Sequence, residues 1–339
     1  MYYIWSKGTP FEVGRNHGKK LSVEIQRAVV DWNVENWLGE NSSECLERVK
    51  EYMLANAPNV IKELEGIADG AKMDYDTIFN LSAFNALSFV KSLSSCSVFA
   101  VPKPEGSGCL ANTVDITSLQ QRWELVHHIK YEGGMELIRI SSVGSVWTTA
   151  GMNSYGVAIG SASAPIFSPQ DGRGIPQHIS ATPVLNQAES TEDAIRLFRE
   201  MRLIGKGMNF VLADSKGNCA IVEKSYDRQA ERRGKQGVAV WATNHFVEQA
   251  TQGHDLRDPE RDYNSRGRYV ALERLLNEEV DKNVVERLKD IVCTPDGNAP
   301  ICRPNTLTAV IADTGSKRLW ISPGRPTKDN FICFSLGDS

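Results

Sequence analysis

The chain has 339 residues, of which 41% are hydrophobic and 24% charged, and its 38 basic and 42 acidic side chains leave a formal net charge of −4. These values are typical of a folded globular protein and exclude an intrinsically disordered chain, which is poor in apolar residues or carries a high net charge. The near-neutral balance also argues against nucleic-acid binding, because proteins that bind the phosphate backbone usually carry a basic domain or stripe.

Targeting signals and metal-binding patterns are missing from the sequence. No run of about 18 apolar residues is present, so no membrane span is predicted. Residues 1–14 (MYYIWSKGTPFEVG) do not resemble a secretory signal, and we expect a cytoplasmic protein with reduced thiols. The seven cysteines include no Cys-x-x-Cys pair, which excludes a zinc ribbon or a thioredoxin-type site. We therefore predict no metal and no cofactor.

The first predicted element is a helix that begins after Thr9. Thr9 is suited to cap it, Pro10 fits the first helical position, and Glu12 completes a capping box. The apolar stripe that follows at helical spacing consists of Val13, His17, Leu21, Ile25, Val29 and Trp32. Gly14 and Gly18 lie near this stripe, and since glycine weakens a helix, we expect close packing against another backbone.

Two further helices are predicted, over 60–71 and 76–90, so the first 92 residues are expected to be mostly helical. Short apolar runs joined by turn residues then dominate the pattern. The predicted strands are Ser97–Val101, Leu110–Ile116, Trp123–Tyr131, Met135–Ser142, Val146–Met152, Gly156–Ser161, Asn209–Ala213, Cys219–Glu223, Val238–Thr243, Thr306–Ala312, Arg318–Ser322 and Phe331–Ser335. Helices are predicted over 190–201 and, as a pair, over 265–292.

Strands joined by hairpins pair antiparallel, so this order predicts the α+β class rather than a parallel βαβ sheet. The run Ser97–Val101 is apolar on both faces. A strand of this kind indicates a sheet that is covered on both sides, and we expect a layered α/β/β/α stack. No stretch resembles a linker, so residues 1–339 are predicted to form one domain.

Most templates for an active site are absent, and Cys96 remains as the candidate nucleophile. The six histidines show no metal-ligand spacing, and no Gly-x-Ser-x-Gly, Walker or Gly-x-Gly-x-x-Gly motif occurs. Cys96 stands where a serine-rich segment meets a strand, which is compatible with simple packing. If the preceding peptide bond were cut, however, its thiol would share a residue with a free α-amine of pKa about 7.7–8.0, which is able to accept the thiol proton.

Seven stretches occur in one order along nearly the whole chain. They are Gly8–Gly18 (GTPFEVGRNHG), Cys96–Ala100 (CSVFA), Ala111–Ile116 (ANTVDI), Gly151–Val157 (GMNSYGV), Asn209–Asp214 (NFVLAD), Thr243–Phe246 (TNHF) and Thr306–Asp313 (TLTAVIAD). Together they resemble the landmarks of the acyl-CoA:isopenicillin N acyltransferase family. This family belongs to the N-terminal nucleophile (Ntn) hydrolases and is also called the C45 autoproteolytic peptidases.

The resemblance implies a four-layer αββα Ntn fold with antiparallel sheets and a chain that cuts itself after Ser95. The products would be an alpha chain of residues 1–95 and a beta chain of residues 96–339 that stay together. The implied activity is that of an amidohydrolase or acyltransferase on a small amide or acyl-donor substrate. Ser95 departs from the glycine that is common before the cleavage point in this family. The oligomeric state, including a homo-oligomer, is left open.

The resemblance also assigns roles to individual residues. Cys96 would be the autocleavage centre and the nucleophile, Asp115 would orient the nucleophile or its amine, and Asn244 would donate its side-chain N–H to the developing oxyanion. Residues implied to bind substrate are Thr113, Ile116, Arg303 and Thr306. Loss of one oxyanion donor typically costs about a hundred- to a thousand-fold in rate.

Cys109 follows a glycine and is a rival cleavage point, but we reject it, because Asp115 would then lie only six residues away on the same strand. Two alternatives stay open at the level of the sequence. A conventional thiol hydrolase would use Cys96 or Cys302 with His245 or His178 as its base. The other alternative is an uncleaved, non-catalytic member of the same fold that only binds a ligand.

Overall fold

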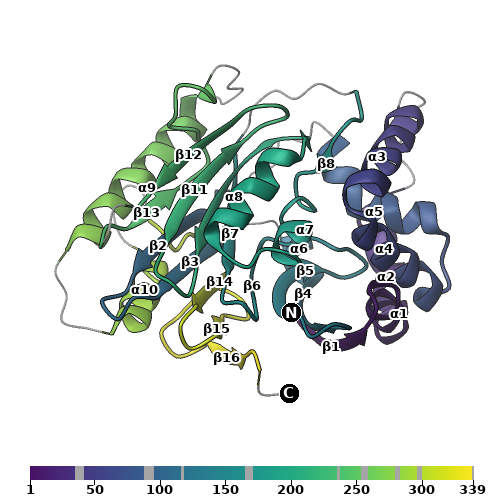
Figure 1. The fold of residues 1–339 in the computed structure, drawn as a ribbon, viewed down its shortest axis with the longest axis horizontal. Helices are drawn as coiled ribbons and strands as arrows, with labels where there is room; N and C mark the ends of the chain where they lie inside the picture. Colours follow the sequence, from purple (N-terminus) through teal and green to yellow (C-terminus); the bar gives the residue numbers. More distant parts are fainter. Residues whose placement is uncertain are drawn as a thin grey trace.

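A computed structural model (Figure 1) describes residues 1–34, 42–87, 95–115, 118–164, 171–234, 237–252, 259–278, 283–295 and 300–337. Its helices are α1 (Pro10–Lys20), α2 (Ser22–Asp31), α3 (Ser42–Asn56), α4 (Pro58–Ala71), α5 (Tyr75–Leu87), α6 (Ser118–Arg122), α7 (Ala181–Leu185), α8 (Thr191–Glu200), α9 (Pro259–Asn277) and α10 (Val284–Val292). In the described ranges, no helix combines the length and the apolar character required to span a membrane.

Two large sheets form the centre of the molecule. The first contains, in spatial order, β1 (Tyr2–Gly8), β4 (Glu124–Tyr131), β5 (Glu136–Ser142), β6 (Ala150–Asn153), β7 (Ala158–Ala164), β10 (Gly207–Ala213), β11 (Cys219–Lys224) and β12 (Gln229–Arg233). The second contains β13 (Val240–Ala242), β2 (Ser97–Pro102), β3 (Gly108–Asp115), β14 (Thr306–Asp313), β15 (Arg318–Ile321) and β16 (Ile332–Ser335). Apart from the parallel pair β1–β4, neighbouring strands in both sheets run antiparallel. The short strands β8 (Ile175–Pro176) and β9 (Leu203–Ile204) pair separately.

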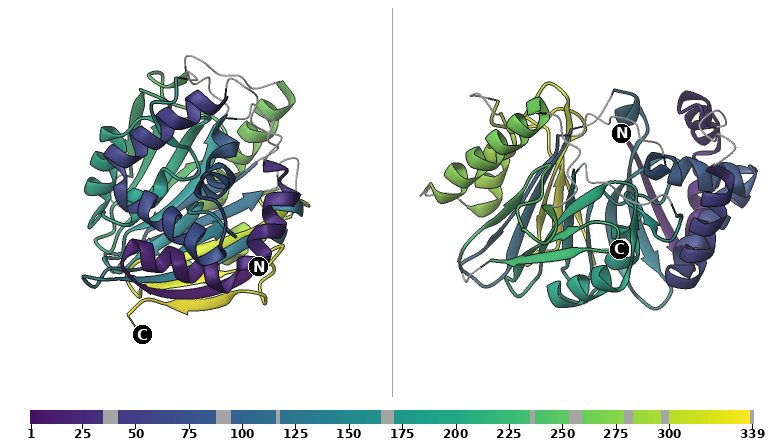
Figure 2. Two further views of the ribbon diagram at one scale, coloured as in Figure 1. Left: turned by 90° about the vertical axis from the view of Figure 1, so that its right-hand side faces the viewer. Right: turned by 90° about the horizontal axis from the view of Figure 1, so that it is seen from above.

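The two sheets pack face to face and helices cover both outer faces, as the side views show (Figure 2). Consecutive residues of β2 enter different cores. Val98 lies in the core between the sheets, whereas Phe99 lies in the core beneath α9 and α10. A third core joins the first sheet to the N-terminal helices and α8. The α+β class and the four-layer αββα arrangement predicted from the sequence are therefore confirmed.

Four glycines allow α1 and α4 to cross in direct backbone contact. A Cβ atom added at Gly14 would stand 1.9 Å from the carbonyl oxygen of Glu63, and one at Gly18 would stand 2.2 Å from that of Ile67. The partner glycines Gly66 and Gly70 on α4 are crowded equally by the backbone of α1. The predicted close packing at Gly14 and Gly18 is confirmed, and only glycine fits this crossing.

The N-terminal segment differs from its prediction in two respects. Residues 2–8 form strand β1, which pairs with β4, instead of belonging to a mostly helical region. The helix that begins with the predicted Thr9 capping box ends at Lys20, because Leu21 leaves the helical conformation at φ −121° and ψ 26°. A second helix, α2, then continues the same apolar stripe with Ile25 and Val29. The periodicity thus marked the buried face correctly but did not reveal the break.

Candidate active site

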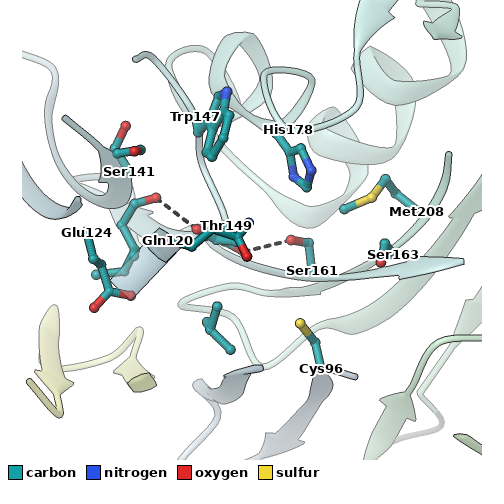
Figure 3. A pocket seen from close by; sticks show the side chains of 13 residues that line it. Cys96, Gln120, Glu124, Ser141, Trp147, Thr149, Ser161, Ser163, His178 and Met208 are labelled. Atoms are coloured by element: carbon teal, nitrogen blue, oxygen red, sulfur yellow. Dashed lines mark hydrogen bonds between the residues drawn. The ribbon is translucent and has the colours of Figure 1, made fainter. Parts of the chain in front are cut away.

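Cys96 immediately precedes β2 and lines a cleft between the two sheets (Figure 3). The residues around the cleft include Glu124, Ser141, Trp147, Thr149, Ser161, Ser163, His178 and Met208. The sulfur of Cys96 points toward the centre of this space, with Trp147 and His178 on the opposite side (Figure 3). We call this space the Cys96 cleft.

The thiol of Cys96 is held in its neutral form. Cys96 is buried and only 6% exposed. Burial, followed by the negative charge of Asp115, raises the pKa of the thiol to about 11, although the Arg268 cation opposes the rise. Because the thiolate is the nucleophile, a base has to take this proton before the sulfur can attack a carbonyl.

Arg268 connects Cys96 to the other residues around it. It stands on the buried face of α9, with Ser265 one turn before it and Leu272 one turn after it, and its side chain is 1% exposed. Its Nη1 donates hydrogen bonds to the carbonyl oxygen of Cys96 at 2.6 Å and to Ser97 Oγ at 2.9 Å. Burial lowers the pKa of Arg268 to about 10, so the group remains charged at neutral pH.

Asn244 follows β13 and is fixed by both ends of its amide. Its Oδ1 accepts a hydrogen bond from Nη2 of Arg268 at 2.8 Å, and its Nδ2 donates to the carbonyl oxygen of Ser163, a residue of the Cys96 cleft, at 2.8 Å. The side chain of Asn209 on β10 supports the same turn by donating to the carbonyl oxygens of Thr243 and His245. The side-chain donor of Asn244 is thus directed at the wall of the cleft.

Asp115 ends β3, the strand next to β2. Its Oδ1 accepts a hydrogen bond of 2.5 Å from the hydroxyl of Thr306, and its Oδ2 lies 3.8 Å from Nη1 of Arg303. Burial raises the pKa of Asp115 to about 6, although Thr306, Arg268 and Arg303 all lower it. Since the β2–β3 register pairs Ser97 with Thr113, Cys96 and Asp115 meet at the same ends of adjacent strands.

The predicted substrate-binding residues lie around the catalytic candidates rather than along the cleft. Thr306 and Arg303 contact Asp115, as described above. Thr113 accepts a hydrogen bond from the backbone N–H of Ser97 at 3.1 Å and so supports the start of β2. Ile116 lies outside the described residues.

The residues that the alternative cleavage point and the thiol-hydrolase mechanism would use lie in different parts of the structure. Cys109 is fully buried within β3, paired with Val101 on one side and Asp313 on the other, and is an internal position of a sheet. Cys302 lies near Arg325 and outside the Cys96 cleft. His245 is held by Ser265, whose Oγ is 2.7 Å from its Nδ1.

His178 does line the Cys96 cleft, and its ring lies 5.1 Å from that of Trp147, measured between centroids. Burial, followed by the positive charge of Lys206, lowers the pKa of His178 to about 4. A histidine with so low a pKa is a weak base near neutral pH, where a general base works best with a pKa close to the operating pH.

Sequence reasoning missed Arg268 and Glu124, whereas it had named His178 as a candidate base beside Cys96. Arg268 is one of several arginines on α9, and a buried arginine has the same sequence pattern as an exposed one. Its one usable signal is its helical spacing from Leu272 and Leu276, which places it on the same buried face of α9. Among the described residues, no group of three or more His, Cys, Asp or Glu side chains is arranged to hold a metal ion.

Comparison with curated proteins and solved structures finds distant relatives. A protein of Archaeoglobus fulgidus, described as an uncharacterized protein, is 25% identical over 292 residues, which cover 75% of this chain and 49% of the relative. The chain thus spans about half the length of that curated relative.

Among solved structures, penicillin V acylase from Agrobacterium tumefaciens is 15% identical with a TM-score of 0.45, over 72% of this chain and 87% of that one. The Caenorhabditis elegans ortholog of N-acylethanolamine-hydrolyzing acid amidase is 11% identical with a TM-score of 0.49, over 65% and 93%. A mutant of conjugated bile acid hydrolase from Clostridium perfringens is 9% identical with a TM-score of 0.46, over 72% and 93%.

A family model gives the decisive match. The model described as acyl-coenzyme A:6-aminopenicillanic acid acyl-transferase matches residues 105–328, well over half of the chain. The matched stretch includes Asp115, Asn244 and Arg268 but begins after Cys96. The family resemblance drawn from the seven motifs is thereby confirmed, and the chain belongs to the acyl-coenzyme A:6-aminopenicillanic acid acyl-transferase family.

Proposed function

We propose that this chain is a self-processing amidohydrolase or acyltransferase whose nucleophile is Cys96. The observation that carries the proposal is the hydrogen-bonded link from Cys96 through Arg268 to Asn244, at one side of the Cys96 cleft. The link gathers a thiol, an amide donor and, on the adjacent strand, a buried carboxyl group. These are the groups that acyl transfer through a thioester requires.

Maturation would begin at the bond between Ser95 and Cys96. The sulfur attacks the carbonyl carbon of Ser95, the C–N bond breaks, and the nitrogen keeps its two electrons and gains the thiol proton. Water then hydrolyses the resulting thioester, which leaves a carboxylate on Ser95 and a free thiol and α-amine on Cys96. The amine supplies the base that the neutral thiol lacks.

The two expected fragments would remain associated. Strand β1, from the fragment 1–95, pairs along its whole length with β4 of the fragment 96–339. The large core beneath the N-terminal helices also draws residues from both fragments, for example Leu64 and Phe210. Separation would expose this apolar surface to water, at a cost of roughly 25 cal/mol for each Å².

In the mature enzyme, the Cys96 amine takes the thiol proton as the sulfur attacks the substrate carbonyl. Asn244 then donates to the oxyanion of the tetrahedral intermediate, and the protonated amine delivers its proton to the leaving nitrogen as the C–N bond breaks. Water or an amine finally attacks the thioester and releases the acyl group. Hydrolysis is the simpler outcome, because water needs no second binding site, whereas the family's name describes transfer from a thioester to an amine.

Purified wild-type protein and Cys96→Ala, screened with N-acyl amino acids, penicillins and acyl-CoA donors, test this function. We expect turnover by the wild-type protein and none by Cys96→Ala. An active Cys96→Ala protein contradicts the choice of nucleophile. An uncut chain whose thiols do not react with iodoacetamide instead identifies the non-catalytic member of the fold.

A thiol hydrolase with a histidine base is the second candidate, because His178 shares the cleft with Cys96. In this mechanism His178→Ala abolishes turnover and no cleavage is required. In the proposed mechanism His178→Ala affects only the shape of the cleft, and cleavage at Cys96 proceeds. Sequencing the N-terminus of the His178→Ala chains together with a rate measurement separates the two.

A further inference from the structure

The Cys96 cleft contains a buried carboxyl group that the proposed mechanism does not use. Glu124, the first residue of β4, is 4% exposed and lines the same cleft as Cys96 (Figure 3). Its Oε2 accepts a hydrogen bond from the hydroxyl of Thr308 on β14. Its Oε1 has no hydrogen-bond partner within the part of the chain that the structure describes. One oxygen of the carboxyl is therefore fixed by Thr308, and the other is buried without a partner among the described residues.

The pKa of Glu124 lies close to neutral pH. Burial raises its pKa to about 7, while the hydrogen bond from Thr308 and the more distant ammonium of Met1 lower it. Burying an ionisable group without a full set of partners is costly, so a position needed only for packing would be better filled by an apolar residue. A ligand that brings a hydrogen-bond donor and a positive charge would offset that cost.

The strand register gives the separation between the backbone of Cys96 and that of Thr308, the residue that binds this carboxyl. Ser97 pairs with Thr113, which puts Cys96 level with Val114, and Val114 pairs with Thr308. Neighbouring strands are about 4.8 Å apart, so Cys96 and Thr308 are roughly 10 Å apart across the sheet. The carboxyl that Thr308 holds is thus within reach of a short chain attached to the scissile carbonyl.

The surroundings of the two ends of the cleft differ. Glu124 lies opposite Ser142 in the β4–β5 register, and Gln120 and Ser141 line the cleft nearby. Of the apolar side chains of the cleft, Trp147 and Met208 lie away from Glu124 (Figure 3), whereas Val114 pairs with Thr308 and so lies near it. The cleft therefore carries its carboxyl group at one end, in a lining of mixed polarity.

We propose that Glu124 is a specificity-determining residue that binds an ammonium group of the substrate, a short chain away from the carbonyl that Cys96 attacks. This inference rests on the proposed function, because it takes the cleft as the place where the acyl donor binds. The preferred substrates are then amides whose acyl part or amine part ends in a primary amine. Thr308 acts as a positioning residue, since its hydroxyl orients the carboxylate.

A binding experiment tests the inference without relying on turnover. The probes are n-hexylamine and n-hexanol, measured by calorimetry on wild-type protein between pH 6 and 8. We expect hexylamine to bind at least tenfold more tightly than hexanol, with the advantage growing as the pH rises and Glu124 ionises. In Glu124→Gln the advantage should vanish and hexanol binding should stay unchanged. Equal binding of both probes to wild-type protein overturns the inference, as does an advantage that survives in Glu124→Gln.

Two further variants make the result specific. Ser141→Ala changes the lining of the same cleft without removing a charge and should keep the preference for hexylamine. Thr308→Val should reduce the preference, because the carboxylate loses the donor that orients it. Thr308→Val also serves if Glu124→Gln folds poorly, and an unchanged preference in a folded Thr308→Val protein counts against the inference.

Turnover then identifies which part of the substrate carries the amine. The substrates are 6-aminohexanoyl anilide against hexanoyl anilide for the acyl part, and the hexanoyl amides of 1,4-diaminobutane and of butylamine for the leaving part. We expect kcat/KM to favour the amine-bearing member of one pair at least tenfold, and Glu124→Gln to remove that difference. Turnover of all four at equal rates overturns the inference while the proposed function stands. If none of the four substrates reacts, the result counts against the proposed function. The binding of hexylamine and hexanol then still tests the role of Glu124.

Discussion

The guanidinium of Arg268 donates a hydrogen bond of 2.6 Å to the backbone carbonyl oxygen of Cys96, from a position on α9 that is far away in the sequence. The same guanidinium donates to Oδ1 of Asn244 at 2.8 Å. A planar guanidinium can hold two acceptors in a fixed relative position, which a flexible ammonium cannot do. Arg268 therefore fixes the distance between the candidate nucleophile and the candidate oxyanion donor.

The variant Arg268→Lys tests this positioning role. A lysine side chain would keep the charge but not the fork, and we expect kcat to fall about a hundredfold, as a displacement of about 1 Å can cause. The matched control is Asn264→Ala, which removes the acceptor of Arg268 Nε and leaves the acceptors of Nη1 and Nη2, at Cys96 and Asn244, in place. Rates and thermal unfolding are measured together. If Arg268→Lys lowers stability but the folded protein keeps its full kcat, the residue is merely structural.

Asn244→Ala should lower kcat by about a hundred- to a thousand-fold and leave KM nearly unchanged, because an oxyanion donor acts mainly in the transition state. Asn244→Asp is the control, since it keeps the oxygen that accepts from Arg268 but loses the N–H donor. Both variants should therefore be slow. A folded Asn244→Ala protein with kcat within about threefold of wild type would remove Asn244 from the catalytic residues.

The raised pKa of Asp115 predicts how the stability of the fold depends on pH. Burial raises its pKa from the ordinary 3.8 to about 6, so between these values the folded state holds a proton that the unfolded state has lost. The free energy of unfolding should therefore fall as the pH rises from about 4 to about 6, by about 3 kcal/mol from this group. Asp115→Asn should remove this part of the fall. Urea unfolding of both proteins at several pH values measures it, and parallel curves would contradict the assignment.

Because α1 and α4 cross in direct backbone contact, we expect that a side chain at Gly14 destabilises the fold. Gly14→Ala would press its Cβ against the carbonyl of Glu63 and should lower the free energy of unfolding by about 3 kcal/mol, at the upper end for overpacking. Lys19→Ala, at an exposed position on the same helix, should change stability very little. Chemical denaturation compares the two, and equal stabilities would show that the helices can move apart at low cost.

The sequence was a good guide wherever local chemistry decides the structure. The Thr9 capping box, the Gly14 and Gly18 crossing and the hairpins at Gly133–Gly134 and at Asp214–Gly217 all follow from residue types at fixed spacings. Strand β1 was missed, because its exposed Tyr3 and Trp5 alternate with buried Ile4 and Ser6 over only seven residues directly before a strong helix signal.

The candidate site was harder to predict than the fold. The adjacency of Cys96 and Asp115 could be anticipated, since both end neighbouring strands of one predicted sheet. Arg268 and Glu124 could not, because their roles depend on burial by elements that are distant in the sequence: α9 against β2, and β4 against β14. A hydrophobic pattern shows which face of an element is buried but not which polar group shares that burial with a nucleophile.

Intact-mass measurement of purified, catalytically competent protein tests the central claim most directly. We predict two chains, residues 1–95 and residues 96–339 with Cys96 as the new N-terminus, together with a Cys96→Ala variant that stays in one piece. A fully active preparation that consists of a single uncut chain would contradict the account.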